Sequence, residues 1–472
     1  MDAARREALL AALRGAVGAA QVLCDGDLSA WELDWRRRWR GKALAVVRPG
    51  TTGEVAAAVR ACAAHGAAIV PQGGNTGLVG ASVPDASGEQ VLLSLARLNR
   101  VRAVDAANLT LVAEAGCVLQ RVQEAADVAG LLFPLRLAAE GSCTIGGNLA
   151  TNAGGTQVLR YGNARELCLG LEVVTPQGEV WPSLGGLRKD NTGYDLRDLY
   201  IGSEGTLGVI TAATLKLFPR PAAQCTALAT CATLDAAVDL LRLAHQRTGP
   251  ALTGFEVMNR FALALVERHF PQLACPLAAA PWTVLLELSD AEGEAHAHAL
   301  FEGLFDRALE RGHVGDVALA TSLARSRALW ALREAIPLAQ AEEGPNVKHD
   351  IALPVSAVAA FVAATDAALG RAFPGIRLVD FGHLGDGNLH YNVQAPDGSD
   401  AAAFLRDHEA AVNRIVYDAV DAHGGSISAE HGIGALKRDE LPRHKPAVAL
   451  ELMRAIKRAL DPQGLMNPGR VL

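Results

Sequence analysis

Three glycine-rich segments lie within the first 211 residues, and they constrain the fold more than any other feature. They run over residues 72–80 (QGGNTGLVG), 141–155 (GSCTIGGNLATNAGG) and 202–211 (GSEGTLGVIT). Glycine tolerates positive φ and lets a backbone approach a ligand closely, so successive N–H groups can point at one anion. Taken singly, such a segment is more often an ordinary turn. Three of them, interleaved with serine, threonine and asparagine, favour a site for a large cofactor that carries a pyrophosphate.

Two common phosphate-binding motifs are absent from these segments. None of the three has the G-x-G-x-x-G spacing between a strand and a helix, so a Rossmann site is not indicated. The chain also lacks G-x-x-x-x-G-K-[ST], which excludes a P-loop.

The pattern of hydrophobic residues and turns predicts an α+β protein. Short strands alternate with loops and helices up to residue 220, and long helical patterns follow a composition shift at 219–223. The expected strands cover 44–48, 68–71, 91–95, 110–113, 169–174, 207–219 and 281–288, with a hairpin over 376–394. The expected helices cover 52–66, 234–246, 291–311, 320–342, 404–423 and 446–460. We expect domains at 1–220 and 221–425, followed by a C-terminal segment at 426–472.

Composition and charge exclude several classes of protein. Half of the 472 residues are hydrophobic and 20% are charged, which favours a large buried core over disorder. The net charge of −7 argues against binding nucleic acid. We expect no membrane span, because no apolar run reaches the roughly 18 residues that one needs. The eight scattered cysteines and the absence of an export signal predict free thiols and a cytoplasmic location.

Histidines and a carboxylate in the last hundred residues could form a metal site. His383 and His390 flank a Gly-Asp-Gly-Asn turn, one on each arm of the expected hairpin, and Glu430 precedes His431 in a glycine-rich segment. Two histidines and one glutamate form the ligand set of many catalytic zinc sites and also of non-heme iron oxygenases. The residues alone do not choose between these two metals, and two strand histidines without any metal remain the simpler interpretation of the pair.

Several long motifs resemble those of one enzyme family. PQGGNTGLVG, EGSCTIGGNLATNAGGTQVLRYG and GSEGTLGVIT resemble the flavin-binding signatures of the vanillyl-alcohol-oxidase-type FAD family. GHLGDGNLHYNV and SAEHGIGALKRDELP resemble the FAD-linked D-2-hydroxy acid dehydrogenases, and among these the D-2-hydroxyglutarate dehydrogenases. The similarity runs from about residue 47 to the terminal NPGRVL. It implies a two-part FAD-binding domain, an α+β substrate or cap domain, and a C-terminal helical segment. That segment, residues 426–472, would pack on the FAD-binding domain and complete the active site.

The resemblance implies FAD as the cofactor, bound without a covalent link because Asn75 and Thr76 stand where some relatives carry a linking residue. The residues expected at FAD are Gly73, Gly74, Asn75, Thr76, Gly77, Leu78, Gly80, Gly141, Ser142, Thr144, Ile145, Gly146, Gly147, Asn148, Ala150, Thr151, Asn152, Gly154, Gly155, Glu204, Gly205, Gly208, Ile210 and Asn467.

The same resemblance places a metal ion on His383, His390 and Glu430. Since the flavin would supply the redox chemistry, the metal need only act as a Lewis acid, which favours Zn²⁺, with Mn²⁺ as the alternative. His431 is the expected base, because an imidazole accepts protons near neutral pH. Arg333 and Lys348 are expected to grip the far carboxylate of the substrate, and Asn392 to make a further contact.

We therefore expect an FAD-dependent enzyme that oxidises a small anionic D-2-hydroxy acid, first D-2-hydroxyglutarate, to the 2-oxo acid. Electrons would pass to an acceptor such as an electron-transfer flavoprotein or a quinone, and a homodimer is left open. Pro337 replaces a hydroxyl residue that the family pattern has one turn after Arg333, which leaves D-lactate, D-malate or glycolate as alternative substrates. The alternative of another class is a non-catalytic flavin-binding subunit of a larger complex.

Overall fold

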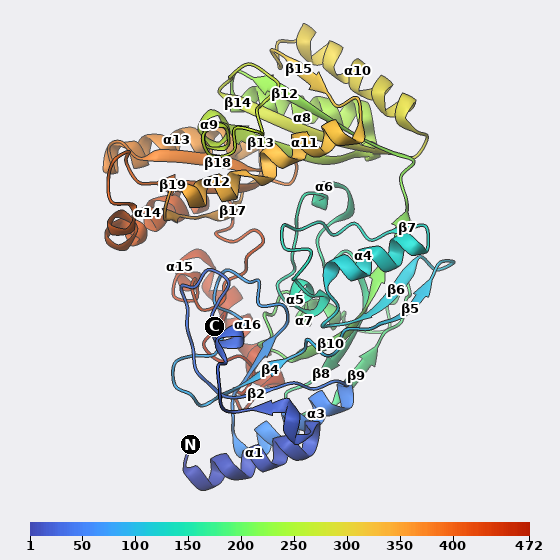
Figure 1. Ribbon diagram of the computed structural model, residues 1–472, viewed down its shortest axis with the longest axis vertical. Helices are drawn as coiled ribbons and strands as arrows, with labels where there is room; N and C mark the ends of the chain where they lie inside the picture. Colours follow the sequence, from blue (N-terminus) through green and yellow to red (C-terminus); the bar gives the residue numbers. More distant parts are fainter. The chain divides into compact units, whose positions relative to one another are not determined.

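The computed structural model describes all 472 residues, and they form two compact units (Figure 1). Unit 1 comprises residues 1–154, 162–220 and 430–472, and unit 2 comprises residues 155–161 and 221–429. The sequence predicts boundaries after residues 220 and 425. The structure divides the chain after residues 220 and 429, and it assigns the short segment 155–161 to unit 2.

The N-terminal part of unit 1 is a four-stranded sheet in the order β1-β2-β4-β3. Strands β2 (Ala43–Val47), β3 (Ile69–Gln72) and β4 (Gln90–Ser94) are parallel, and β1 (Val22–Leu23) pairs with β2 in the antiparallel direction. Helix α3 (Thr52–His65) connects β2 to β3, and the Thr51 side chain caps it by accepting the Glu54 N–H. Helix α1 (Ala3–Val17) packs on α3 through its buried leucines.

The second sheet of unit 1 has five antiparallel strands in the order β5-β6-β10-β8-β9. Its bounds are β5 Val101–Asp105, β6 Thr110–Glu114, β8 Cys168–Val174, β9 Val180–Ser183 and β10 Val209–Lys216. The central strand β10 is buried along almost its whole length. Around this sheet lie α4 (Leu119–Val128), α5 (Ile145–Ala150), α7 (Arg197–Tyr200) and the small pair β7 (Leu131–Leu132) and β11 (Phe218–Pro219).

The last 43 residues of the chain return to unit 1 and carry α15 (Leu441–His444) and α16 (Ala447–Leu460). Beyond α16, the Leu465 carbonyl accepts the N–H of Ile69, and the Asn467 N–H donates to the Ile69 carbonyl. The chain end is therefore tied to the start of β3, immediately before the first glycine-rich segment.

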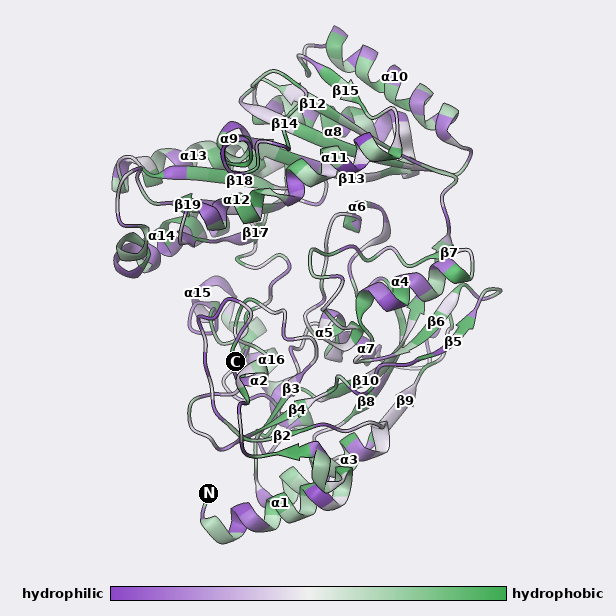
Figure 2. Cartoon of the chain, in the orientation of Figure 1, coloured by the Kyte–Doolittle hydropathy of each residue, from purple (hydrophilic) through white to green (hydrophobic).

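Unit 2 is built on an antiparallel sheet in the order β15-β12-β14-β13-β18-β19-β16, with β17 also paired to β19. The strands are β12 Ala223–Cys231, β13 Leu252–Asn259, β14 Trp282–Asp290, β15 Val317–Leu319, β16 Asn346–Val347, β17 Asp350–Ala352, β18 Arg377–His383 and β19 Asn388–Gln394. In Figure 2 these strands are mainly hydrophobic, whereas the covering helix α10 carries hydrophilic stretches.

Helices cover both faces of this sheet. One apolar cluster includes buried residues of α8 (Leu234–Thr248), α10 (Glu294–Glu310), α13 (Val358–Ala372) and α14 (Ala401–Ala422). A second cluster includes residues of α9 (Arg260–His269), α11 (Leu323–Glu334) and α12 (Ile336–Glu342). The helix α6 (Val158–Tyr161) also belongs to this unit and contacts β13. The second face, under α11 and α12, carries the polar residues described below.

The sequence predicts one helix over residues 320–342, and that prediction is wrong. The structure has α11 and α12, which meet at Ala335. Pro337 explains the break, because it lacks an N–H and its ring would collide with the Arg333 carbonyl in a continuous helix. Proline is tolerated in the first turn of a helix, and Pro337 lies in the first turn of α12.

One helical stretch, Val355–Ala372, has the length and apolar composition of a membrane span, and 28% of it is buried within the structure. The sequence predicts no membrane span here, because the apolar run is interrupted by Asp366. Core helices of globular proteins pass the same test of length and composition. Within unit 2, Asp366 of this stretch accepts a hydrogen bond from the Tyr391 hydroxyl at 2.6 Å, and Phe361 stacks edge-on against the Tyr391 ring.

Candidate functional site

The three glycine-rich segments converge on one pocket of unit 1. Of the residues predicted to bind FAD, the pocket is lined by Gly73, Gly146, Gly147, Ala150, Thr151, Glu204, Gly205, Gly208 and Ile210. The sequence analysis missed Pro71, Gln72, Ala81, Ser82, Leu95, Ser203 and Val209, which also line it.

The other predicted FAD residues lie in the same segments but outside the lining of this pocket. Gly74, Asn75, Thr76, Gly77, Leu78 and Gly80 belong to the loop that follows β3, and Gly141, Ser142, Thr144, Ile145, Asn148, Asn152 and Gly154 surround or form α5. Gly155 belongs to unit 2. The Ile145 side chain is only 1% exposed, and its N–H donates to the Cys117 carbonyl.

Several non-glycine residues in the segments around the pocket hold a left-handed backbone, which is rare for residues with a side chain. Asn75, Asn152, Glu204 and Asn467 have φ between 43° and 54°. The Asn467 Nδ2 donates to the carbonyls of Ala81 and Glu204, at 3.0 and 2.7 Å, so this residue joins two walls of the pocket. The Asn75 Nδ2 donates to the Leu33 carbonyl at 2.9 Å, which fixes the first loop to the chain before β2.

Two features show that the pocket fits a phosphate-bearing cofactor. The first and second segments approach so closely that a Cβ on Gly74 would lie 2.0 Å from the Ser142 carbonyl oxygen. The buried Thr144 Oγ1 and Asn467 Oδ1 have no hydrogen-bond partner within the protein. Buried polar atoms are normally paired, so unpaired atoms beside a glycine-lined pocket are consistent with a bound polar ligand.

Glu204 has a second role that the sequence did not reveal. Its carboxylate accepts the N–H groups of Ile433 and Gly434, each at 2.7 Å. Gly432 has a φ of +81°, a backbone conformation that favours glycine, and a Cβ there would lie 2.7 Å from Glu204 Oε1. Burial raises the pKa of Glu204, although the two N–H groups and the charge of Lys437 oppose the rise. Glu204 therefore anchors the segment that follows His431.

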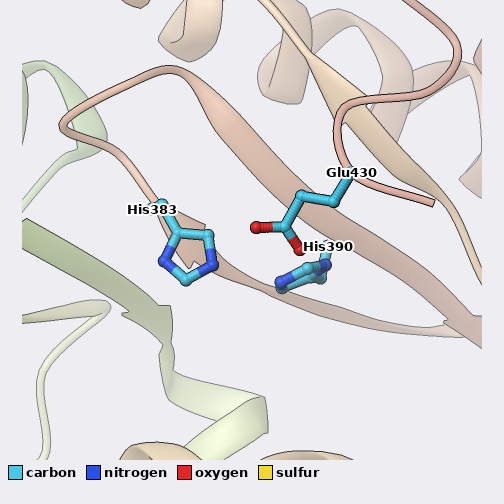
Figure 3. A group of neighbouring side chains, drawn as sticks. All are labelled: His383, His390 and Glu430. Atoms are coloured by element: carbon cyan, nitrogen blue, oxygen red, sulfur yellow. The ribbon is translucent and has the colours of Figure 1, made fainter. Parts of the chain in front are cut away.

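His383, His390 and Glu430 come together as predicted from the sequence. Strands β18 and β19 form the expected hairpin, and the ring centroids of His383 and His390 lie 5.5 Å apart. Their ring nitrogens and a Glu430 carboxylate oxygen lie within 4.8 Å of one another. Figure 3 shows the Glu430 carboxylate pointing toward both imidazoles. Glu430 directly follows Ala429, whose N–H donates to the Asp350 carbonyl of β17, and this bond ties Glu430 to the hairpin.

This donor set fits a divalent metal ion. Imidazole nitrogens and a carboxylate oxygen are the ligands of zinc in many catalytic sites. The His383 Nδ1 lies 2.5 Å from Glu256 Oε1 and donates to it, which leaves Nε2 to face the group. A second set with the same spacing consists of Asp350, Glu430 and His431. The sequence analysis did not include Asp350, because a single aspartate before a strand carries no signal of its own.

Arg333 is buried rather than displayed at the surface. It is 7% exposed, its Nε donates to Glu256 Oε2 at 2.7 Å, and its guanidinium lies 4.7 Å from the Phe381 ring centroid. Burial alone would raise the pKa of Glu256, but the His383 and Arg333 side chains that bond to it hold it down to about 2. Arg333 and His383 therefore share one buried carboxylate, a link that the sequence spacing could not show.

The other predicted substrate residues differ in exposure. Lys348 is exposed and lies between β16 and β17. Asn392 is 3% exposed, its Oδ1 accepts the His349 N–H at 3.1 Å, and its Nδ2 donates to Gln340 Oε1 at 3.0 Å. The oxygen and the nitrogen of the Asn392 side-chain amide thus each have a partner within unit 2.

Comparison with known proteins identifies the family. Residues 43–182 match the model of the FAD binding domain, and residues 220–471 match that of the FAD linked oxidases, C-terminal domain. The chain is 41% identical over 463 residues to the mitochondrial D-2-hydroxyglutarate dehydrogenase of Bos taurus, covering 98% of this chain and 83% of that protein. It is 42% identical to the D-2-hydroxyglutarate dehydrogenase of Xanthomonas citri pv. viticola, with 94% and 92% covered.

Solved structures confirm the predicted fold. The p-cresol methylhydroxylase structure with substrate bound matches with a TM-score of 0.78 at 15% identity, covering 100% of this chain and 97% of that one. The 4-ethylphenol oxidase from Gulosibacter chungangensis matches with a TM-score of 0.73 at 19% identity, covering 100% and 98%. The fold is thus of the vanillyl-alcohol-oxidase type, and the chain belongs to the D-2-hydroxyglutarate dehydrogenase family of FAD-linked oxidases.

Proposed function

We propose that this chain oxidises D-2-hydroxyglutarate to the 2-oxo acid, with FAD held non-covalently and a divalent metal ion, preferably Zn²⁺, on His383, His390 and Glu430. The observation that carries the proposal is the convergence of these three donors within 4.8 Å, in a chain whose relatives over nearly its full length are D-2-hydroxyglutarate dehydrogenases. Mn²⁺ is the second candidate for the metal.

Two groups divide the chemistry of the proposed reaction. Bound FAD supplies the acceptor for the hydride on the α-carbon, and the bound metal ion supplies a Lewis acid for the hydroxyl and carboxylate. The alcohol also loses the hydroxyl proton, for which this chain offers the His431 imidazole. General base catalysis of this kind typically contributes about 10²–10⁴-fold in rate.

Two cationic side chains of unit 2, Arg333 and Lys348, would bind the substrate. Arg333 donates to Glu256 through Nε, so its two terminal amino groups are the ones that would bind the far carboxylate of the substrate. Guanidinium binds a carboxylate through two parallel hydrogen bonds, and this geometry favours a dicarboxylate. The exposed Lys348 would add a second positive charge. Electrons would leave FAD for an electron-transfer flavoprotein or a quinone, and the chain would act alone or as a homodimer.

A second candidate, oxidation of D-lactate or glycolate, is favoured by one observation. Pro337 supplies no hydroxyl where the family pattern has one, so one hydrogen bond to a far carboxylate is missing. A substrate without a far carboxylate makes no such hydrogen bond, so proline at position 337 would not weaken its binding.

Steady-state kinetics of the FAD- and zinc-loaded chain with an artificial electron acceptor test the proposal. The substrates are D- and L-2-hydroxyglutarate, D-malate, D-lactate and glycolate. We expect the highest kcat/KM for D-2-hydroxyglutarate. A higher value for D-lactate or glycolate would favour the second candidate, and a preference for the L-acid would contradict the stereochemistry. No turnover with any of the acids would point to a non-catalytic flavin subunit.

A further inference from the structure

Glu256 is a buried carboxylate on the face of the unit 2 sheet that α11 and α12 cover. It lies on β13, next to Val257, which pairs with Gly382 of β18, so the following pair in this register sets Glu256 opposite His383. The residue is fully buried, and its surroundings on this face include the apolar side chains of Met258, Leu285 and Phe381.

Each oxygen of this carboxylate has its own partner. Oε1 lies 2.5 Å from the His383 Nδ1, and Oε2 lies 2.7 Å from the Arg333 Nε. A buried charge is costly unless it is paired and hydrogen-bonded, so Glu256 depends on both donors, and both donors are fixed by it. The Arg333 guanidinium is held from its other side by the Phe381 ring.

We infer that Glu256 is a positioning residue that fixes the His383 imidazole for the metal ion and the Arg333 guanidinium for the substrate carboxylate through one buried anchor. The inference deepens the proposed function and rests on it. A carboxylate that accepts the Nδ1–H of a metal-binding histidine fixes its tautomer, orients its ring and makes Nε2 a stronger ligand. Glu256 also bonds to Arg333, so it fixes the group that would bind the substrate carboxylate. A shift of the His383 imidazole or of the Arg333 guanidinium would therefore disturb the other.

The contact between the second histidine and Asp350 is longer. The His390 Nδ1 lies 3.9 Å from the Asp350 Oδ1, beyond hydrogen-bond distance, and Asp350 Oδ1 accepts the Asn388 Nδ2 at 2.9 Å. Of these two contacts, the one between His383 and Glu256 is within hydrogen-bond distance.

The same sheet face provides a matched control for mutation. Glu287 of β14 is also buried and also bonds to α11, because its Oε2 accepts the Trp330 Nε1 at 2.9 Å. Its Oε1 accepts the Thr253 hydroxyl at 3.2 Å and the Gln157 Nε2 at 3.4 Å. Glu287→Gln thus perturbs a buried glutamate under the same helix without touching the proposed anchor.

Zinc affinity tests the inference without relying on activity. Competition with a chromophoric chelator is measured on the full-length, FAD-loaded chain for wild type, Glu256→Gln, Glu256→Asp and Glu287→Gln. Loss of this kind of partner typically weakens metal binding about 10- to 100-fold, which we expect for Glu256→Gln. Glu256→Asp keeps the charge and should recover part of the loss, and Glu287→Gln should stay within about twofold of wild type.

Kinetics at saturating zinc supply the second readout. Because Arg333 loses its anchor, KM for D-2-hydroxyglutarate should rise in Glu256→Gln by a larger factor than KM for D-lactate, which has no far carboxylate. If wild type binds zinc tightly and Glu256→Gln binds it equally tightly, this inference is overturned while the proposed function stands. An equal loss in Glu287→Gln would also overturn it. Absence of zinc binding by wild type would overturn the metal centre of the proposed function and this inference with it.

Discussion

The Glu204 carboxylate accepts the backbone N–H of Ile433 at 2.7 Å, and this bond joins two segments that are 229 residues apart in the sequence. Together with the second bond, to Gly434, it anchors the chain just after His431. The third glycine-rich segment therefore contributes to the pocket of unit 1 and also holds the segment that carries the expected base.

Glu204→Gln should weaken this anchor, because an amide oxygen can accept one of the two N–H groups while the NH₂ group opposes the other. Leaving a buried N–H unpaired costs about 1–3 kcal/mol, and we expect the free energy of unfolding to fall by that amount. Denaturant unfolding measures it, together with kcat. Glu172→Gln, at a glutamate of unit 1 that bonds to Thr52 and Arg102, is the control. A kcat as high as in the control would show that the anchor does not position the segment.

His431→Asn should reduce kcat about 10²–10⁴-fold, because an amide does not accept the hydroxyl proton as an imidazole does. Bound FAD and zinc should remain at wild-type levels, which absorbance spectra and metal analysis can check. The control is His245→Asn, at an exposed histidine of α8. If His431→Asn turns over as fast as this control, another group removes the proton.

Pro337→Thr should restore the hydroxyl that the family pattern places one turn after Arg333. One added hydrogen bond is worth about 1 kcal/mol, so KM for D-2-hydroxyglutarate should fall about fivefold, with little change for D-lactate. Pro337→Val is the control, because valine has the shape of threonine without its hydroxyl. It makes the same change in helix geometry but adds no hydrogen bond. Equal effects of the two substitutions would mean that the hydroxyl does not reach the substrate.

Asp380 gives a prediction about pH and stability. Burial, and then the neighbouring Asp366 carboxylate, raise the pKa of Asp380 well above its ordinary value. The folded state therefore retains a proton that the unfolded chain releases, and this carboxyl lowers stability progressively as the pH rises above about 4. Asp380→Asn should raise the free energy of unfolding at about pH 8 by at least about 1 kcal/mol, with a smaller gain near pH 4.

Denaturant unfolding at several pH values checks this prediction. Asp397→Asn is the control, because the Asp397 side chain is 88% exposed and should show no such dependence. A gain from Asp380→Asn that is the same at every pH would mean that the carboxyl does not titrate as its burial implies.

The sequence predicted those parts of the structure that depend on local pattern. The hairpin that carries His383 and His390 follows from its alternating strands and its glycine turn, and the helices 52–66 and 446–460 are found within two residues of the predicted bounds. The three glycine-rich segments meet at one pocket, as their composition suggested. The family and the FAD cofactor followed from the long motifs that these same segments contain.

The remainder depends on contacts between distant residues. Glu256 stands in a run of strand residues, where a lone carboxylate was the only signal, and its partners lie 77 and 127 residues away. The anchoring role of Glu204 and the buried position of Asn392 likewise depend on partners that no local sequence pattern predicts. Strands β12 and β13 were missed because both of their faces are buried, so they lack the alternation of polar and apolar residues.

Anaerobic reduction of the bound flavin by D-2-hydroxyglutarate, with and without the metal ion, tests the central claim most directly. The FAD-loaded chain is stripped of metal with a chelator, and bleaching of the flavin absorbance is followed before and after zinc is restored. We predict rapid bleaching by the D-acid in the zinc-loaded chain, almost none in the stripped chain, and recovery when zinc is returned. Bleaching at the same rate in the fully stripped chain would contradict the account.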